Sequence, residues 1–109
     1  VGSIFENLVV SEVLKAQRNN GLQPNLFFYR DSSGLEVDLI LEEQLQPHPI
    51  EIKSAQTFNP ALYKNLLRFM ELAPGASSPA LVYGGEAMGT LQGVKILSFN
   101  QITELLASV

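Results

Sequence analysis

The clearest pattern in the chain is an alternation of apolar and polar side chains over residues 35–42. Successive side chains of a strand point to opposite faces, so Val37, Leu39 and Leu41 are expected to share one buried face. The residues between 31 and 34 begin with Asp and end with Gly, which is typical of a type I turn. Residues 26–30 and 35–42 are therefore predicted to form a hairpin. The polar face of the second strand would carry Glu36, Asp38, Ile40 and Glu42.

A second alternating segment, residues 50–53, places Glu51 and Lys53 on one face and two isoleucines on the other. If this segment pairs with residues 35–42, side chains across the pair lie about 5 Å apart. Asp38, Glu51 and Lys53 are then expected to meet on one face.

Two helices are predicted on either side of these strands. The first begins at Ser3, where Glu6 completes a capping box, and runs to about Arg18. Glu6 and Glu12 both fall on its apolar arc but well apart. The core stripe would be Phe5, Leu8, Val9, Val13 and Ala16, and the solvent face would be Asn7, Ser11, Lys15 and Arg18.

The second helix is predicted from an Asn59 cap and Pro60 at the first helical position to about Leu72. Lys64 and Arg68 would face solvent, and the inward side would carry Leu62, Leu66, Phe69 and Met70. The other expected elements are a polar connection at 43–49, a strand buried on both faces at 80–83, a strand at 94–97 and a short helix at 102–107. The order α-β-β-β-α-β-β-α predicts an α/β fold with a mixed sheet flanked by helices.

Composition limits the chemistry of this single 1–109 domain. No apolar run approaches the roughly 18 residues of a membrane span, and no signal peptide is evident, which predicts a cytoplasmic protein with no membrane partner. The chain has no cysteine and one histidine, which excludes thiolate sites and argues against a His-rich zinc site. A metal site in this chain would therefore be formed by oxygen ligands.

The net charge of −4, with only seven Lys and Arg, argues against strong nucleic-acid binding by charge alone. The first residues begin a helix at once and include no initiator Met. We interpret the chain as a piece of a longer protein.

Two carboxylates and one ammonium at a strand edge, Asp38, Glu51 and Lys53, suit a hard divalent cation and a polarised water. The alternative is a cross-strand ion pair worth about 0.2–1 kcal/mol.

The helical Glu6, the strand residue Asp38 and the segment Glu51-Ile52-Lys53 resemble the PD-(D/E)xK nuclease superfamily, whose restriction-endonuclease-like core has the order α-β-β-β-α-β. The resemblance implies that Glu6, Asp38 and Glu51 hold Mg²⁺ or Mn²⁺, with help from the carbonyl of Ile52. The alternative for Glu6 is a capping role alone. It also implies that Lys53 orients the attacking hydroxide.

A narrower resemblance covers nearly the whole chain. The segments concerned look like those of the uncharacterised C-terminal domain of bacterial and archaeal AAA+-like P-loop ATPases, which implies an N-terminal ATPase partner. No phosphate-binding loop of the G-x-x-x-x-G-K-[ST] type occurs in this sequence. The matching segments are Phe5-Glu6-Asn7-Leu8-Val9, Phe28-Tyr29-Arg30, Gly34-Leu35-Glu36-Val37-Asp38 and Ile50-Glu51-Ile52-Lys53.

Several other charged residues have two interpretations each. Arg30 either binds phosphate or neutralises the carboxylates, and Lys64 with Arg68 either contact phosphates or form a solvated helix face. Glu36 is a further ligand or a solvated strand end. Glu12 is expected to be a buried partner of a basic residue such as Arg30, and His48 is expected to be inert in a loop.

Two functions follow. The first is a Mg²⁺-dependent nuclease that hydrolyses phosphodiester bonds, with Asp38, Glu51 and Lys53 as its catalytic residues. The second is a catalytically inactive nuclease-fold module that serves recognition or assembly for its ATPase.

Overall fold

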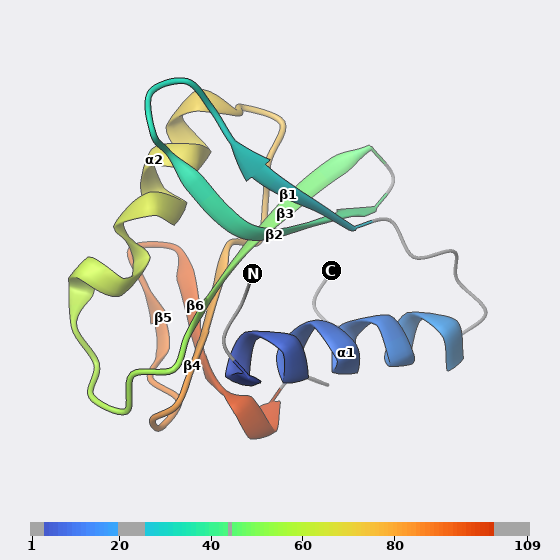
Figure 1. Cartoon of the computed structure of the whole chain (residues 1–109). Coiled ribbons are helices and arrows are strands. Elements are labelled where there is room, and N and C mark those ends of the chain that lie inside the picture. The colour runs from blue at the N-terminus through green and yellow to red at the C-terminus, as the bar shows by residue number, and fades with distance from the viewer. Residues whose placement is uncertain (1–3, 20–25, 44, 102–109) are drawn as a thin grey trace.

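A six-stranded mixed sheet forms the centre of the protein in a computed structural model that describes residues 4–19, 26–43 and 45–101 (Figure 1). The strands lie in the order β1-β2-β3-β4-β6-β5. The helices are α1 (Ile4–Asn19), α2 (Lys64–Leu72) and the short 3-10 helices η1 (Pro60–Tyr63) and η2 (Phe99–Gln101). The strands are β1 (Leu26–Arg30), β2 (Glu36–Glu43), β3 (Gln46–Lys53), β4 (Ala80–Tyr83), β5 (Gly89–Leu91) and β6 (Val94–Ser98).

The sheet combines two kinds of strand pairing. Strands β1, β2 and β3 form an antiparallel meander, while β3, β4 and β6 run parallel. The segment between β3 and β4 contains η1 and α2, as a parallel connection requires. The mixed α/β architecture predicted from the sequence is therefore confirmed.

Helix α1 covers one face of the sheet through a narrow apolar stripe. Val9 and Val13 are fully buried against Leu39 and Ile52. The prediction that Leu8 belongs to this stripe is wrong, since the residue is 49% exposed. Val9 and Val13 are the buried line of α1, and Phe5 and Val10 pack against the same cluster while only partly buried.

Glu12 was expected to be a buried partner of a basic residue, and this prediction is also wrong. Its position on α1 is exposed, and Arg30 is paired with Glu36 instead. The solvent face predicted for α1 is confirmed, because all four of its residues are exposed.

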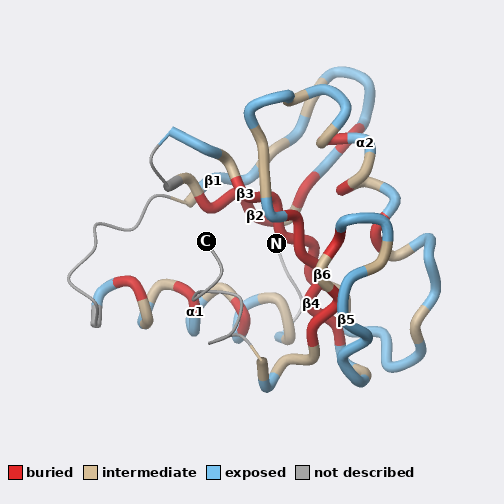
Figure 2. Tube along the Cα trace, turned by 180° about the vertical axis from the view of Figure 1, so that it is seen from behind, coloured by how far each residue is buried: buried red, intermediate tan, exposed pale blue. Residues whose placement is uncertain are grey.

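Helix α2 and η1 cover the opposite face. Leu66, Phe69 and Tyr63 are buried there against residues such as Leu81. The Asn59 cap is confirmed, because its side-chain oxygen accepts a hydrogen bond of 2.9 Å from the backbone N–H of Ala61. Strand β4 lies between the two layers and is buried on both faces, as its apolar sequence predicts (Figure 2).

A β-bulge interrupts the alternation of β2. Phe27 pairs with Ile40 and Tyr29 pairs with Val37, so Asp38 and Leu39 together face the single residue Phe28. The bulge reverses the side on which side chains lie, and Val37 packs in the α2 layer while Leu39 packs in the α1 layer. The prediction that these two residues share a face is therefore wrong.

Strand β3 is longer than the sequence indicates. It begins at Gln46, directly after Leu45, whose φ is 67°, and its pairing with β2 extends to Glu43 and Gln46. The predicted polar connection at 43–49 is therefore mostly strand, despite its prolines.

His48 consequently lies inside β3 rather than in a loop. It is buried, and its Nδ1 lies 2.9 Å from the backbone oxygen of Ser77. Because a carbonyl oxygen only accepts, this geometry places the imidazole proton on Nδ1. This contact links the segment before β4 to strand β3.

The C-terminal part contains one strand more than predicted. Strand β5 forms a hairpin with β6 through Gln92 and Gly93, which both have positive φ as a two-residue hairpin turn requires. The helix predicted at 102–107 and the Ser3 cap lie outside the described residues. No helix in the described part of the chain is both long and apolar enough to cross a membrane.

Candidate functional site

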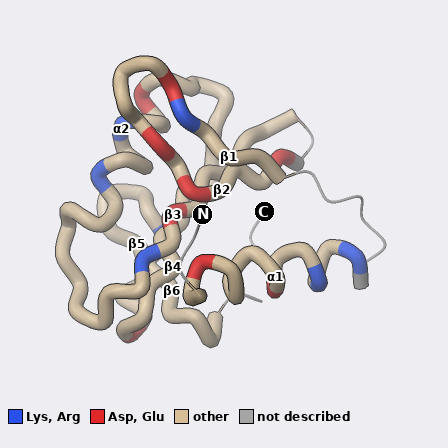
Figure 3. The backbone as a smooth tube through the Cα atoms, in the orientation of Figure 1, with Lys and Arg blue, Asp and Glu red and all other residues tan. Residues whose placement is uncertain are grey.

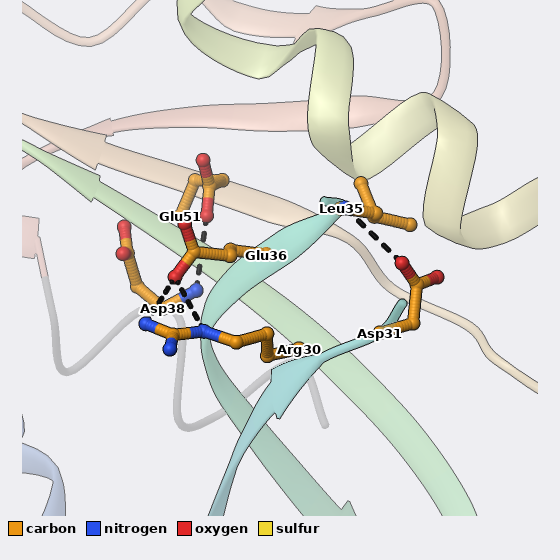
Figure 4. A network of polar contacts seen from close by, with 6 residues as sticks. All are labelled: Arg30, Asp31, Leu35, Glu36, Asp38 and Glu51. Atoms are coloured by element: carbon orange, nitrogen blue, oxygen red, sulfur yellow. Dashed lines mark hydrogen bonds and ion pairs between the residues drawn. The ribbon is translucent and has the colours of Figure 1, made fainter. Parts of the chain in front are cut away.

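Strands β2 and β3 part at the candidate site, and two carboxylates occupy the opening. The last registered pair is Leu39 with Ile50. Beyond it, the backbone N–H of Asp38 donates to Glu51 Oε1 at 3.0 Å (Figure 4). The backbone N–H of Ile52 donates to Asp38 Oδ2 at 2.8 Å. Side-chain oxygens thus replace the backbone acceptors that regular pairing would supply.

Asp38 and Glu51 approach each other from different sides of the sheet. Alternation along β3 directs Ile52 into the α1 layer and Glu51 toward the α2 layer. The bulge directs Asp38 toward α1, where it lines a cavity with residues of that helix. The prediction that the two residues lie close together is confirmed. The predicted reason, a shared strand face, is wrong.

The cavity lies between α1 and the parting strands and has a volume of about 260 Å³. Glu6 of α1 and Asp38 of β2 are the carboxylates that line it, and Ile52 of β3 also lines it, whereas Glu51 does not. Its complete lining is Glu6, Asn7, Val10, Ser11, Phe28, Asp38 and Ile52. The predicted association of Glu6 with Asp38 therefore has a geometric basis in this cavity.

Glu51 is an ionisable side chain in an unfavourable place for charge. It is only 2% exposed. Burial and the negative charge of Asp38 raise its pKa from the ordinary 4.5 to about 7, although the N–H of Asp38 and the charge of Lys53 act in the opposite direction. The site therefore holds negative charge that a cation would stabilise.

Lys53 is the cationic group at the site. Its Nζ lies 3.5 Å from Glu51 Oε2, and 39% of its side chain is exposed. The residue pairs with Tyr83 at the carboxyl ends of the parallel strands β3 and β4. Lys53 thus reaches Glu51 while remaining accessible to a bound molecule.

None of the basic residues proposed from the sequence lines the cavity, and this includes Lys53. Arg30 donates to Glu36 Oε1 from Nε at 3.0 Å and from Nη2 at 2.7 Å, and both side chains are exposed (Figure 4). Lys64 and Arg68 are exposed on α2, in the layer opposite α1. Figure 3 shows basic positions spread over separate elements, whereas acidic positions lie close together along β2.

Sequence reasoning overlooked Phe28 as a functional candidate. It is 79% exposed although it is a large apolar residue of β1, and it borders the cavity. The only sequence signal for its exposure is alternation along β1, which puts Phe28 on the face opposite that of Tyr29. The Tyr29 ring packs against Phe69 with ring centroids 5.0 Å apart.

Few side chains at the site could serve as metal ligands. Among the described residues, no three His, Cys, Asp or Glu side chains are grouped closely enough to hold a metal ion together. Mg²⁺ commonly binds through only one or two carboxylates and retains several waters. Asp38 and Glu51, whose charges already disfavour each other, fit that requirement.

The fold and the cavity define a mixed α+β domain with paired carboxylates in the opening between two strands. The chain belongs to the family described as "Domain of unknown function (DUF4143)", which it matches over residues 1–102, and which is a domain found in AAA-like ATPases. A search among curated proteins returned no match, and a search among solved structures also returned none.

Proposed function

We propose that this domain is a Mg²⁺-dependent nuclease that hydrolyses phosphodiester bonds of nucleic acid. The observation that carries the proposal is the convergence of Asp38 and Glu51 where β2 and β3 part. Two carboxylates held this close, one of them buried, are costly to the fold unless a proton or cation compensates their charge.

Asp38 and Glu51 would hold the cation, and Glu6 would approach it from α1. The chemistry that such a cation supplies is polarisation of a water molecule and neutralisation of charge on a phosphate. Lys53, within 3.5 Å of Glu51 and partly exposed, would orient the attacking water and attract the phosphate. The backbone donors at Asp38 and Ile52 hold both carboxylates in place.

The proposed partner in the full-length protein is an ATPase domain that precedes this one. Membership in a family found in AAA-like ATPases supports it. Because the chain carries a net charge of −4, attraction of phosphates by this domain would contribute little of its affinity for nucleic acid.

The first test is calorimetric titration of the chain with Mn²⁺ and Mg²⁺. We expect Glu51→Gln and Asp38→Asn each to weaken binding by at least about tenfold, since even loss of groups outside the ligand set can have that effect. Binding should also strengthen from pH 6 to pH 8, roughly the range over which Glu51 loses its proton.

Glu36→Gln is the matched control, because Glu36 lies on the same strand but is exposed and paired with Arg30. It should bind the cation as the parent does. Equal binding by the parent and Glu51→Gln would contradict the proposed site, and cleavage assays with the full-length protein would then lose their rationale.

A second function is favoured by one observation. Lys53 already forms an ion pair with Glu51, and backbone N–H groups already occupy an oxygen of each carboxylate. These contacts are also what a catalytically inactive module would retain to stabilise the fold. Absence of metal binding in the parent would favour this module, which would serve recognition or assembly for its ATPase.

A further inference from the structure

Strand β1 forms one edge of the sheet and displays an aromatic and a cationic side chain on the same side. Tyr29 packs into the α2 layer against Phe69. Phe28 and Arg30 therefore point toward the side on which α1 lies. Their exposed fractions are 79% for Phe28 and 78% for the Arg30 side chain.

Phe28 also belongs to the cavity that contains Asp38. Because the bulge of β2 lies directly opposite it, Phe28 faces Asp38 and Leu39 across the strand pair. A ring this exposed gains little from the core, so its packing does not explain its position. It does provide a flat apolar surface beside Asp38, one of the proposed catalytic carboxylates.

The charge of the molecule restricts what this surface can bind among nucleic acids. The cavity carries Glu6 and Asp38, and the net charge is −4, so attraction of many phosphates cannot be the main source of affinity. Base stacking on an aromatic ring requires no cationic surface and tolerates any sequence. It does require a base that is free of a duplex stack.

We propose that Phe28 is a stacking platform for an unpaired nucleobase, and that the substrate of this domain is single-stranded or locally unpaired nucleic acid. Arg30 would leave Glu36 and contact a phosphate of the same strand. The proposal rests on the proposed nuclease function, because it assigns the substrate class of that same cavity.

The test is fluorescence anisotropy with a short fluorescein-labelled oligothymidylate, alone and annealed to its complement. Binding is measured once in EDTA, which removes divalent cations, and once in Ca²⁺, which binds oxygen ligands but is larger than Mg²⁺. We expect Phe28→Ala to weaken single-strand binding roughly 5- to 100-fold, which is the loss of one base–aromatic stack. Phe28→Tyr should restore it, since the ring is retained.

Phe27→Ala is the matched control, because Phe27 is a half-exposed ring on the opposite side of the same strand. It should leave binding unchanged. The proposal is overturned if neither buffer supports single-strand binding, if the duplex binds as tightly, or if Phe28→Ala binds like the parent.

The outcomes separate this inference from the proposed function. Single-strand binding that depends on Phe28, combined with no Mn²⁺ binding in calorimetry, would support the stacking platform and contradict the nuclease. Mn²⁺ binding that depends on Glu51, without an effect of Phe28→Ala on oligonucleotide binding, would support the nuclease and contradict the stacking platform.

Discussion

Glu51 shows how one residue can oppose the stability of the fold that buries it. Its two neighbours along β3 are buried isoleucines, so alternation alone would place it at the surface. The α2 layer covers that face as well, and the carboxylate is left almost without solvent. A buried carboxylate beside another one is a common feature of functional sites, because burial and like charge shift its pKa toward neutrality.

This shift predicts a pH dependence of stability. Because the pKa of Glu51 is raised to about 7 in the folded state, the folded chain binds a proton more tightly than the unfolded one. Stability contributed by protonated Glu51 is thus full below about pH 4.5 and is lost as the pH rises through about 7. The loss is of the order of 3 kcal/mol at most.

Urea unfolding of the parent and of Glu51→Gln from pH 5 to pH 8 measures this effect. The free energy of unfolding of the parent should fall relative to that of the variant across this range. Glu36→Gln should run parallel to the parent. Parallel curves for Glu51→Gln as well would show that Glu51 titrates normally.

At the level of elements, two loops follow the parallel strands β3 and β4 and lie backbone against backbone. Gly84 donates from its N–H to the oxygen of Ala55 at 2.9 Å. A Cβ at Gly85 would lie 2.5 Å from the oxygen of Gln56 and 2.7 Å from the Tyr83 ring. The loop directly after Lys53 is therefore held by a contact that admits no side chain.

We expect Gly85→Ala to lower the free energy of unfolding by roughly 1–3 kcal/mol, the usual cost of forcing atoms into a packed region. Gly75→Ala is the control, because a Cβ there meets no atom within 4 Å and the residue has no positive φ. Thermal or urea unfolding measures both variants. Equal stability of the two would show that the loops adjust without cost.

At the level of the whole molecule, charge predicts how binding responds to salt. Seven basic residues are spread over the chain, and Arg30 is the basic side chain that shares the exposed side of β1 with Phe28. If stacking dominates, the logarithm of the single-strand affinity should fall with the logarithm of salt concentration with a slope near −0.7, about one phosphate contact. Anisotropy at several salt concentrations measures it, and a slope of several units would contradict a stacking mode.

Several features were predictable because they depend on nearby residues alone. The Asn59 cap followed by Pro60, the turn from Asp31 to Gly34 and the apolar run of β4 all follow local rules, and the structure confirms them. The sequence also excludes a thiolate metal site in this chain, because it contains no cysteine. Membership of the chain in a domain family found in AAA-like ATPases was likewise accessible from its motifs.

The tertiary structure decided the features that depend on pairing between distant segments. The bulge at Asp38 and Leu39 exists only because β1 and β2 pair in two registers, and no local pattern reveals a register. The same bulge sends Asp38 to the α1 side, separates Val37 from Leu39 and places Phe28 at the cavity. Burial of Glu51 and His48 similarly required layers from elsewhere in the chain, because burial is a property of the packed molecule and not of a segment.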